Sequence, residues 1–201
     1  MSGVVVPGFA TSRKTPGVFL NVILGGAASS PAASPIKILL MGNKSAAISV
    51  SSPTLALPAG TIAVNTPIAL ASEDDAATYF GLGSEVHVMA RAVFAQYPDA
   101  TLYGIAVAEA GTAGDVICTF ANAATAAYAL RVRACGYTFD VSVASGDSIA
   151  TIVTALCNAV NAVTWLPFYA QFSTGAVTFT AKNTGPRGND LAVLLSFVSS
   201  S

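Results

Sequence analysis

A change of hydrophobic period between residues 137 and 162 constrains the fold more than any other feature of the sequence. Apolar and polar residues alternate through "YTFDVSV", 137 to 143, as they do in a strand with one buried face. Gly146 ends this strand, and we expect Ser145 or Asp147 to cap a following helix. In "SIATIVTALCNAVNA", 148 to 162, the apolar residues recur every three or four positions in one stripe: Ile149, Ile152, Val153, Leu156, Cys157 and Val160. The sequence therefore predicts an amphipathic helix lying across an antiparallel sheet.

Short β-type segments flank this helix. We predict strands at 116–120, 127–133, 136–143, 167–172, 176–182 and 191–198, with hairpin turns at Gly136 and Gly175. The pattern begins at "EAGTAGD", 109 to 115. Residues 111–201 are thus expected to form a β-rich β-β-α-β-β module that folds as a separate domain.

Residues 36–110 have a different pattern. "IKILLMG", 36 to 42, predicts a buried strand, and a loop rich in Ser, Pro and Ala runs from 43 to about 66. Ser72 and Ser84 are good caps for two helices, the first ending at Gly81 and the second stopped by Pro98. "ATLYGIAVA", 100 to 108, predicts another buried strand. This β-α-α-β order is typical of a small α/β layer with parallel strands.

Residues 1–35 are predicted to be an extended N-terminal arm. Two Pro-Gly pairs and "GGAASSPAASP" enclose one β-favouring run, "VFLNVIL", 18 to 24. Such a strand could pair with a distant strand of its own subunit or with the sheet edge of a neighbour. The candidate subunit-contact residues are Pro16, Gly17, Val18, Phe19 and Val22. The expected fold class is α+β or α/β: arm, α/β layer and β-rich module.

Composition narrows the class of protein. Only 9% of the residues are charged and the net charge is −1, so no basic excess is available to bind a nucleic-acid backbone. No apolar run reaches the length of about 18 residues that suggests a transmembrane helix, and the order of charges and prolines at the N-terminus does not fit a signal peptide. Cys118, Cys135 and Cys157 match neither a zinc pattern nor a disulfide framework. We expect reduced, mostly buried thiols in a protein made in the cytoplasm.

No group of residues has the spacing of a catalytic, cofactor or metal site. His87 has no Ser or Cys nucleophile placed beside it by the sequence, which favours a surface or packing role. "EDD", 73 to 75, suits the first turn of a helix better than a metal site, because successive helical residues point in different directions. "GLGSEV", 81 to 86, lacks the lysine of a phosphate loop and reads as a helix-to-helix corner. We expect no catalytic residue, cofactor or metal.

One loop-like run remains as a candidate contact. "KNTGPRGND", 182 to 190, holds two glycines, a proline and two cations. A turn between strands or a subunit contact is the expected role, and a ligand-binding loop is the alternative. The candidate residues of this contact loop are Arg187, Asn189 and Asp190.

Two segments resemble a known family. "KILLMGNK", 37 to 44, followed by "TPIALASEDDAATYFGLGSEVHVMARAVFAQYPDATLYGIAV", 66 to 107, resembles the contractile tail sheath proteins of Mu-like bacteriophages. "TPGVFLNV", 15 to 22, is similar to an early Pro-Gly-Val-aromatic segment of that family, and "GPRGND", 185 to 190, to the end of its inserted domain. The matching residues of the longest segment are Ser72, Asp75, Ala76, Phe80, Gly81, Gly83, Ser84, Met89, Arg91, Ala92, Phe94, Leu102 and Ile105.

The resemblance implies a structural protein of the virion. Sheath subunits form stacked rings around the tail tube and contract to drive it through the host envelope. Residues 36–110 would belong to the main domain, and 111–201 to an outward-facing inserted domain. The implied partners are other copies of the chain, the tail tube protein, and the baseplate and tail terminator proteins, with no nucleic acid and no direct membrane insertion. Family members are longer, so the resemblance also implies a truncated or short member without the C-terminal sheath domain, mainly monomeric on its own.

Two other classes of function stay open. The chain could be a self-contained phage decoration or adhesion module that binds a host or carbohydrate surface, which exposed aromatic residues on the 115–195 sheet would favour. A small hydrolase is the third alternative, and it would need a polar pocket around His87.

Overall fold

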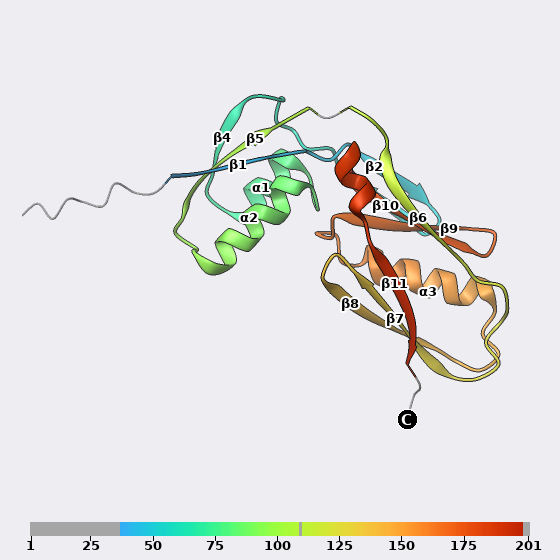
Figure 1. Ribbon diagram of the computed structural model, residues 1–201. Helices are drawn as coiled ribbons and strands as arrows, with labels where there is room; N and C mark the ends of the chain where they lie inside the picture. The colour runs from blue at the N-terminus through green and yellow to red at the C-terminus, as the bar shows by residue number, and fades with distance from the viewer. Residues whose placement is uncertain (1–36, 109, 199–201) are drawn as a thin grey trace, which may run out of the picture. The chain divides into compact units, whose positions relative to one another are not determined.

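The computed structural model describes residues 37–108 and 110–198, which form a mixed α+β fold with two hydrophobic cores (Figure 1). The fold class therefore agrees with the sequence prediction. The candidate arm residues Pro16, Gly17, Val18, Phe19 and Val22 lie outside the described residues. No helix in the described part of the chain is long and apolar enough to cross a membrane.

A three-stranded sheet with two helices builds the first region. Strand β1 (Lys37–Gly42) pairs in parallel with the central strand β5 (Thr101–Ala106), as predicted, and β4 (Pro67–Leu70) pairs antiparallel on the other side of β5. Helix α1 (Glu73–Phe80) begins at Ser72, whose Oγ accepts a hydrogen bond from the Asp75 N–H (3.1 Å). Helix α2 (Glu85–Gln96) begins at Ser84, whose Oγ accepts a hydrogen bond from the His87 N–H (3.2 Å). Both predicted caps are confirmed.

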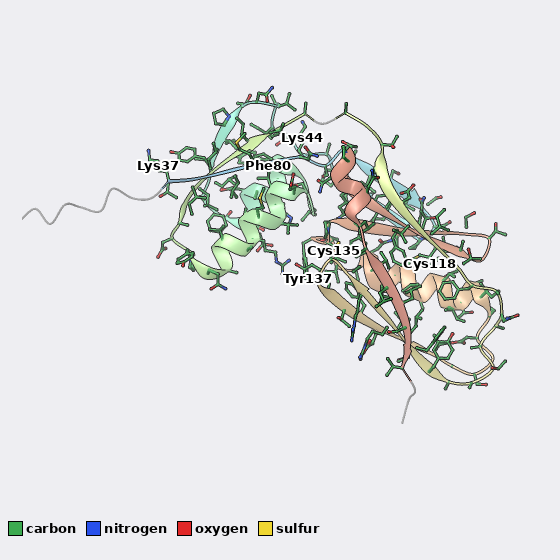
Figure 2. All side chains as sticks on the ribbon, in the orientation of Figure 1. Lys37, Lys44, Phe80, Cys118, Cys135 and Tyr137 are labelled. Carbon is green, nitrogen blue, oxygen red and sulfur yellow. The ribbon has the colours of Figure 1, made fainter. Side chains whose placement is uncertain are left out.

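The core of this region lies between the helices and one face of the sheet. Phe80, from the last turn of α1, is fully buried (Figure 2). A Cβ at Gly104 of β5 would lie 2.6 Å from the Phe80 ring, so the strand can approach the ring only because position 104 has no side chain. The other fully buried residues of this core are Ala76, Val86, Ala90, Leu102 and Ala106.

Two sequence predictions for this region are wrong. Strand β1 is not buried on both faces, because Leu39 and Met41 are 53% and 57% exposed while Leu40 faces the helices. The segment 43–66 is not a plain loop, since β2 (Ile48–Ser51) and β3 (Thr54–Leu57) form a hairpin within it. Strand β4 was also missed. These strands are only four residues long, so their alternation is too short to stand out in a segment rich in Ser, Pro and Ala.

The second region consists of two antiparallel sheets and one helix. The predicted strands are all present: β6 (Ala113–Thr119), β7 (Tyr128–Ala134), β8 (Tyr137–Val143), β9 (Phe168–Ser173), β10 (Ala176–Thr184) and β11 (Val193–Val198). The hairpins β7–β8 and β9–β10 lie in different sheets, with orders β11-β7-β8 and β6-β10-β9. Each hairpin thus gains a third strand from outside the β-β-α-β-β unit that the sequence predicted.

Helix α3 (Ile149–Asn161) packs its apolar stripe into the core of this region. Ile152, Val153, Leu156, Cys157 and Val160 are at most 1% exposed, as the period of the sequence predicted. The N-cap is Ser148, which accepts a hydrogen bond from the Thr151 N–H (3.1 Å), rather than Ser145 or Asp147. Asp147 instead accepts from the Ala144 N–H (2.7 Å) and closes the turn before the helix.

Candidate functional site: the junction around His87 and Lys182

A cluster of polar side chains joins the start of α2 to the end of β10. We call it the junction; it comprises Gly83, Glu85, His87 and Arg91 on one side, and Trp165, Lys182 and Asn183 on the other. The corner between α1 and α2 positions its first half. Gly81 and Gly83 turn the chain with φ of +86° and +75°, a conformation that favours glycine. The predicted helix-to-helix corner at "GLGSEV" is therefore present.

Gly83 is needed for close approach as well as for its backbone conformation. A Cβ at this position would lie 2.1 Å from the carbonyl oxygen of Leu166 and 2.7 Å from Lys182 Nζ. Both neighbours belong to the second region, so any side chain at position 83 would push the two halves of the junction apart.

His87 is buried inside the junction, with an exposed fraction of 1%. Its Nδ1 accepts a hydrogen bond from the Gly83 N–H (2.9 Å), so the neutral ring carries its proton on Nε2, which lies 3.6 Å from Glu73 Oε1. Burial lowers the pKa of His87, outweighing the neighbouring Glu73 carboxylate, which raises it. Because the only lone pair of the neutral imidazole is already used by a backbone N–H, His87 has no basic nitrogen to offer a substrate.

Arg91 lies one turn further along α2 and contacts both regions. Its guanidinium lies 3.6 Å from the centre of the Trp165 ring, within the range of a cation–π contact. Its Nη1 is 3.8 Å from Glu73 Oε1, but both side chains are partly exposed, at 34% and 43%. The ion pair is therefore a weak one, and the stacked ring is the more specific contact.

Lys182 supplies the central contact of the junction. It ends the alternating part of β10 and is only 5% exposed. Its Nζ donates to the carbonyl oxygens of Leu82 (3.2 Å) and Thr164 (2.5 Å), one from each region. Burial lowers its pKa to about 8. These two bonds occupy an amine that would otherwise be a reactive nucleophile at this pKa.

Further hydrogen bonds continue the junction towards the end of β10. The backbone N–H of Glu85 donates to Asn183 Oδ1 (3.2 Å), and the side chain of Asn43 donates to the carbonyl oxygen of Thr184 (3.3 Å). The Glu85 carboxylate accepts from the backbone N–H of Asn43 (3.0 Å). Within the described residues, no buried side-chain nitrogen or oxygen lacks a hydrogen-bond partner. The junction thus has the character of a structural contact.

The predicted contact loop is a compact turn. Residues Pro186–Asp190 form a short 3-10 helix, η1, and the N–H of Gly185 before it donates to the carbonyl oxygen of Thr112 (3.0 Å). Asn189 is exposed there, and the side chains of Arg187 and Asp190 lie outside the described part of the chain. Asn189 is not among the residues of the junction, whereas Lys182 and Asn183, which begin the predicted run 182–190, are. The role of Arg187, Asn189 and Asp190 as a subunit contact stays a prediction.

Other candidate groups lie apart from the junction. Cavities of about 610 and 410 Å³ are lined by neither His87 nor Lys182. The described residues hold no group of three or more His, Cys, Asp or Glu side chains that could bind a metal. Cys157 is buried and Cys118 is half-buried, but Cys135 is exposed, so the prediction of mostly buried thiols is wrong for that residue. Gly136 forces a tight hairpin turn that leaves Cys135, with φ of +49°, at its tip.

Sequence reasoning missed Lys182 as a central residue. The alternation in "VTFTAK", 177 to 182, places Lys182 on the outer face of β10, which normally faces solvent. It is buried because the α1–α2 corner covers that end of the strand, and no local pattern reports such a long-range contact.

No protein-family model matches this sequence, and no curated protein is detectably similar to it.

Proposed function

We propose that this chain is a structural subunit of a contractile bacteriophage tail sheath, located in the virion, which surrounds the tail tube and contracts to drive it through the host envelope. The resemblance of residues 37–44 and 66–107 to sheath proteins of Mu-like phages is the starting point. The observation that carries the proposal is the outer face of sheet β1-β5-β4, which no helix in the described residues covers.

This outer face is mainly apolar, with Lys37 and Thr101 at one end, where Lys37 Nζ lies 5.8 Å from the centre of the Tyr103 ring. Its side chains alternate with those of the core, and Leu39 and Met41 are more than half exposed. Tyr103 and Ile105 lie opposite them on β5, with Ala69 and Pro67 on β4. A contiguous apolar patch of this kind marks a surface that another protein covers. In a sheath, neighbouring copies of the subunit would cover it.

The residues that carry the resemblance also have scaffold roles in the fold. Ser72 and Ser84 cap the two helices, Phe80 fills the core, and Gly81 and Gly83 make the corner between the helices. None of these five roles involves a substrate or cofactor. A sequence pattern of this type supports a structural role rather than a catalytic site.

The two alternative functions receive less support. In the second region, Phe197 on β11 is 74% exposed, and every other described aromatic side chain is partly or fully buried, so the sheets offer one exposed ring rather than the broad stacking surface that a carbohydrate-binding module needs. A hydrolase built on His87 lacks a basic nitrogen, because Gly83 already occupies Nδ1. Neither alternative explains the apolar outer face.

Electron microscopy of phage particles tests the proposal. An antibody raised against the folded chain should decorate contractile tails along their whole length in particles released by the bacterium that carries the gene. Pre-immune serum and antibody absorbed with the purified chain are the controls. Labelling confined to the capsid surface or the tail tip would favour the decoration or adhesion alternative, and particles without label would contradict both.

A further inference from the structure

The two sheets of the second region leave one side of their shared core open. Helix α3 closes the side between β8 and β9. On the opposite side the edges of β6 and β11 face each other, but they are not paired in any sheet. We call this opening the seam; it is bounded by β6, Ala113–Thr119, and β11, Val193–Val198 (Figure 1).

The core side chains are more exposed at the seam than on the side that α3 covers. The five buried residues that α3 contributes are at most 1% exposed, and Ile149, Ala155 and Ala159 of the same helix are partly buried. Along the seam, the inward-facing apolar side chains are only partly buried: Val116, Cys118, Leu191, Val193 and Leu195. On the outer side of the same two strands, Ile117 is 66% and Leu194 is 59% exposed. Phe197, near the end of β11, is 74% exposed, so the exposed large apolar side chains of the second region all lie on β6 and β11 within the described residues.

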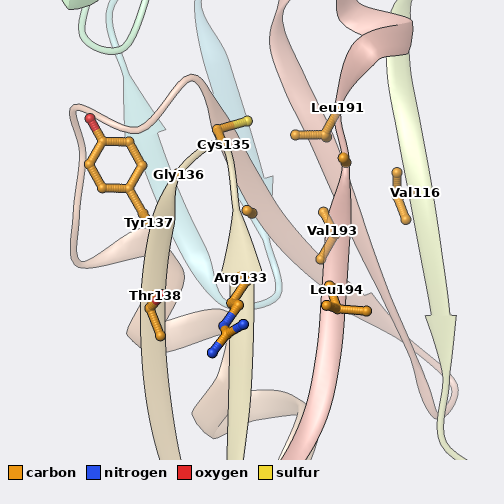
Figure 3. A pocket seen from close by; sticks show the side chains of 11 residues that line it. Val116, Arg133, Cys135, Gly136, Tyr137, Thr138, Leu191, Val193 and Leu194 are labelled. Carbon is orange, nitrogen blue, oxygen red and sulfur yellow. The ribbon is translucent and has the colours of Figure 1, made fainter.

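A cavity of about 610 Å³ opens at one end of the seam (Figure 3). Val116 of β6 lies on one side of it, and Val193 and Leu194 of β11 lie across from Val116. The β7–β8 turn around Cys135 and Tyr137 closes the end. Apolar side chains line the part of the space between β6 and β11, and Arg133 and Thr138 line it at the ends of β7 and β8.

The strand directions fit one further strand. Both β6 and β11 begin beside η1 and run away from it (Figures 1 and 3). Two strands that run the same way are the correct neighbours for a single strand antiparallel to both. Its addition would give one continuous antiparallel sheet of order β9-β10-β6-added strand-β11-β7-β8.

The composition of the two edges matches an uncharged strand. Strand β11, "VLLSFV", carries no charge and no proline, and β6, "AGDVICT", carries one charge, at Asp115. Natural proteins usually protect exposed edges with charges, prolines or covering elements. The edge of β9 has such a cover, since the Phe172 N–H donates to Ser52 of the β2–β3 hairpin (3.0 Å). The edges at the seam have no such bond among those identified in the described residues.

We propose that the seam is a receptor site for one extended β-strand donated by a partner protein chain, antiparallel to β6 and β11. The donor strand has about six residues, is uncharged, and is apolar at every second position, so that alternate side chains enter the cavity. Only a segment with both edges unpaired can bond to β6 and β11 together. A strand already built into the sheet of a second copy does not meet this condition. This proposal does not rest on the sheath assignment.

Fusion of a donor strand to the full chain tests the seam. The probe is a flexible Gly-Ser linker followed by Thr-Val-Thr-Val-Thr-Val-Thr after Ser201. The control has the same linker and Thr-Pro-Thr-Pro-Thr-Pro-Thr, which cannot donate ladder hydrogen bonds. The Val fusion should raise the melting temperature by about 5 °C or more, since each kcal/mol shifts Tm by about 2–4 °C in a chain of this size.

Thiol labelling gives a second readout. Cys118 lies on β6 at the seam and Cys135 lines its cavity, whereas Cys157 is buried on the inner face of α3. Labelling of the first two should slow in the Val fusion and remain unchanged in the Pro fusion. Equal melting temperatures and labelling rates for the two fusions would overturn the proposal.

Two further outcomes identify other occupants. A concentration-dependent dimer of the unextended chain, abolished by Leu194→Lys, would assign the edge to a second copy. Protection of both seam thiols already in the unextended monomer would mean that a segment of the same chain fills the site. Either result would overturn the assignment to a partner chain.

Discussion

The outer faces of two sheets in this molecule differ in chemistry. On β7 and β8, the outer face carries Arg131, Arg133, Thr138 and Asp140, and Arg131 forms a two-pronged ion pair with Asp140 (both contacts 2.7 Å). On β1, β5 and β4 the corresponding face carries Leu, Met, Tyr, Ile, Pro and Ala side chains, with Lys37 and Thr101 at one end. Both sheets have a well-buried inner face. Only the second sheet has a mainly apolar outer surface.

The difference indicates which surfaces meet water in the assembled protein. A polar outer face is stable in solvent without a partner, as on β7–β8. An apolar one gains free energy of about 25 cal/mol per Å² when another surface covers it. We therefore expect the β1-β5-β4 face to lie in a subunit contact and the β7–β8 face to point outwards.

The core of the second region should be the most sensitive to truncation. Leu156 is fully buried beneath both sheets, so Leu156→Ala should lower the free energy of unfolding by about 2–5 kcal/mol. Urea denaturation measures this loss. Asn158→Ala, at an exposed position of the same helix, is the control and should change stability by about 0.5 kcal/mol or less. A loss near zero for Leu156→Ala would place that face of α3 in water.

The junction should make stability depend on pH through Lys182. Burial lowers its pKa in the folded chain to about 8, from an ordinary value of 10.5, so the folded state binds fewer protons than the unfolded state between these values. Stability contributed by this residue therefore rises as the pH rises from 8 to 10.5, by about 3 kcal/mol or less. Urea denaturation of wild type and Lys182→Met at several pH values isolates this effect. Parallel pH profiles for the two proteins would show that Lys182 is solvated.

The two faces of β1 should respond differently to the same substitution. Leu39→Thr should change the stability of the isolated chain by about 0.5 kcal/mol or less, because Leu39 is 53% exposed. Leu40→Thr is the matched comparison in the next position and should cost about 2–4 kcal/mol, because Leu40 is 8% exposed. Thermal unfolding of both variants gives the measurement. Equal losses would mean that the outer face is already covered within the chain.

Much of the fold could be predicted from the sequence. The alternation in "YTFDVSV" and the stripe from Ile149 to Val160 predicted the correct strand and helix. Each element has one buried and one more exposed face, and its apolar residues therefore recur with the period of that element. "KILLMG" predicted the correct strand but the wrong burial. A mostly apolar run does not show whether one or both of its faces are covered by the rest of the same chain. The pairing of β6 and β11 with different hairpins depends on long-range contacts that no local period reports.

Less of the candidate site could be predicted. Ser84 and the glycine corner were recognisable from helix-capping rules, and they position one half of the junction. His87 was expected to be a surface or packing residue, and its burial agrees with the second of these roles. Lys182 and Trp165 could not be identified, because their partners lie far along the chain.

Oxidative footprinting of Met41 tests most directly whether the apolar outer face is an assembly contact. Met41 is 57% exposed in the isolated chain, and Met89, which packs against the core of the same region, serves as the internal reference. Hydroxyl-radical labelling followed by mass spectrometry should modify Met41 readily in the purified chain and only weakly in intact phage particles, with Met89 changing little. Equal modification of Met41 in both samples would contradict the account, because the face would then remain in water after assembly.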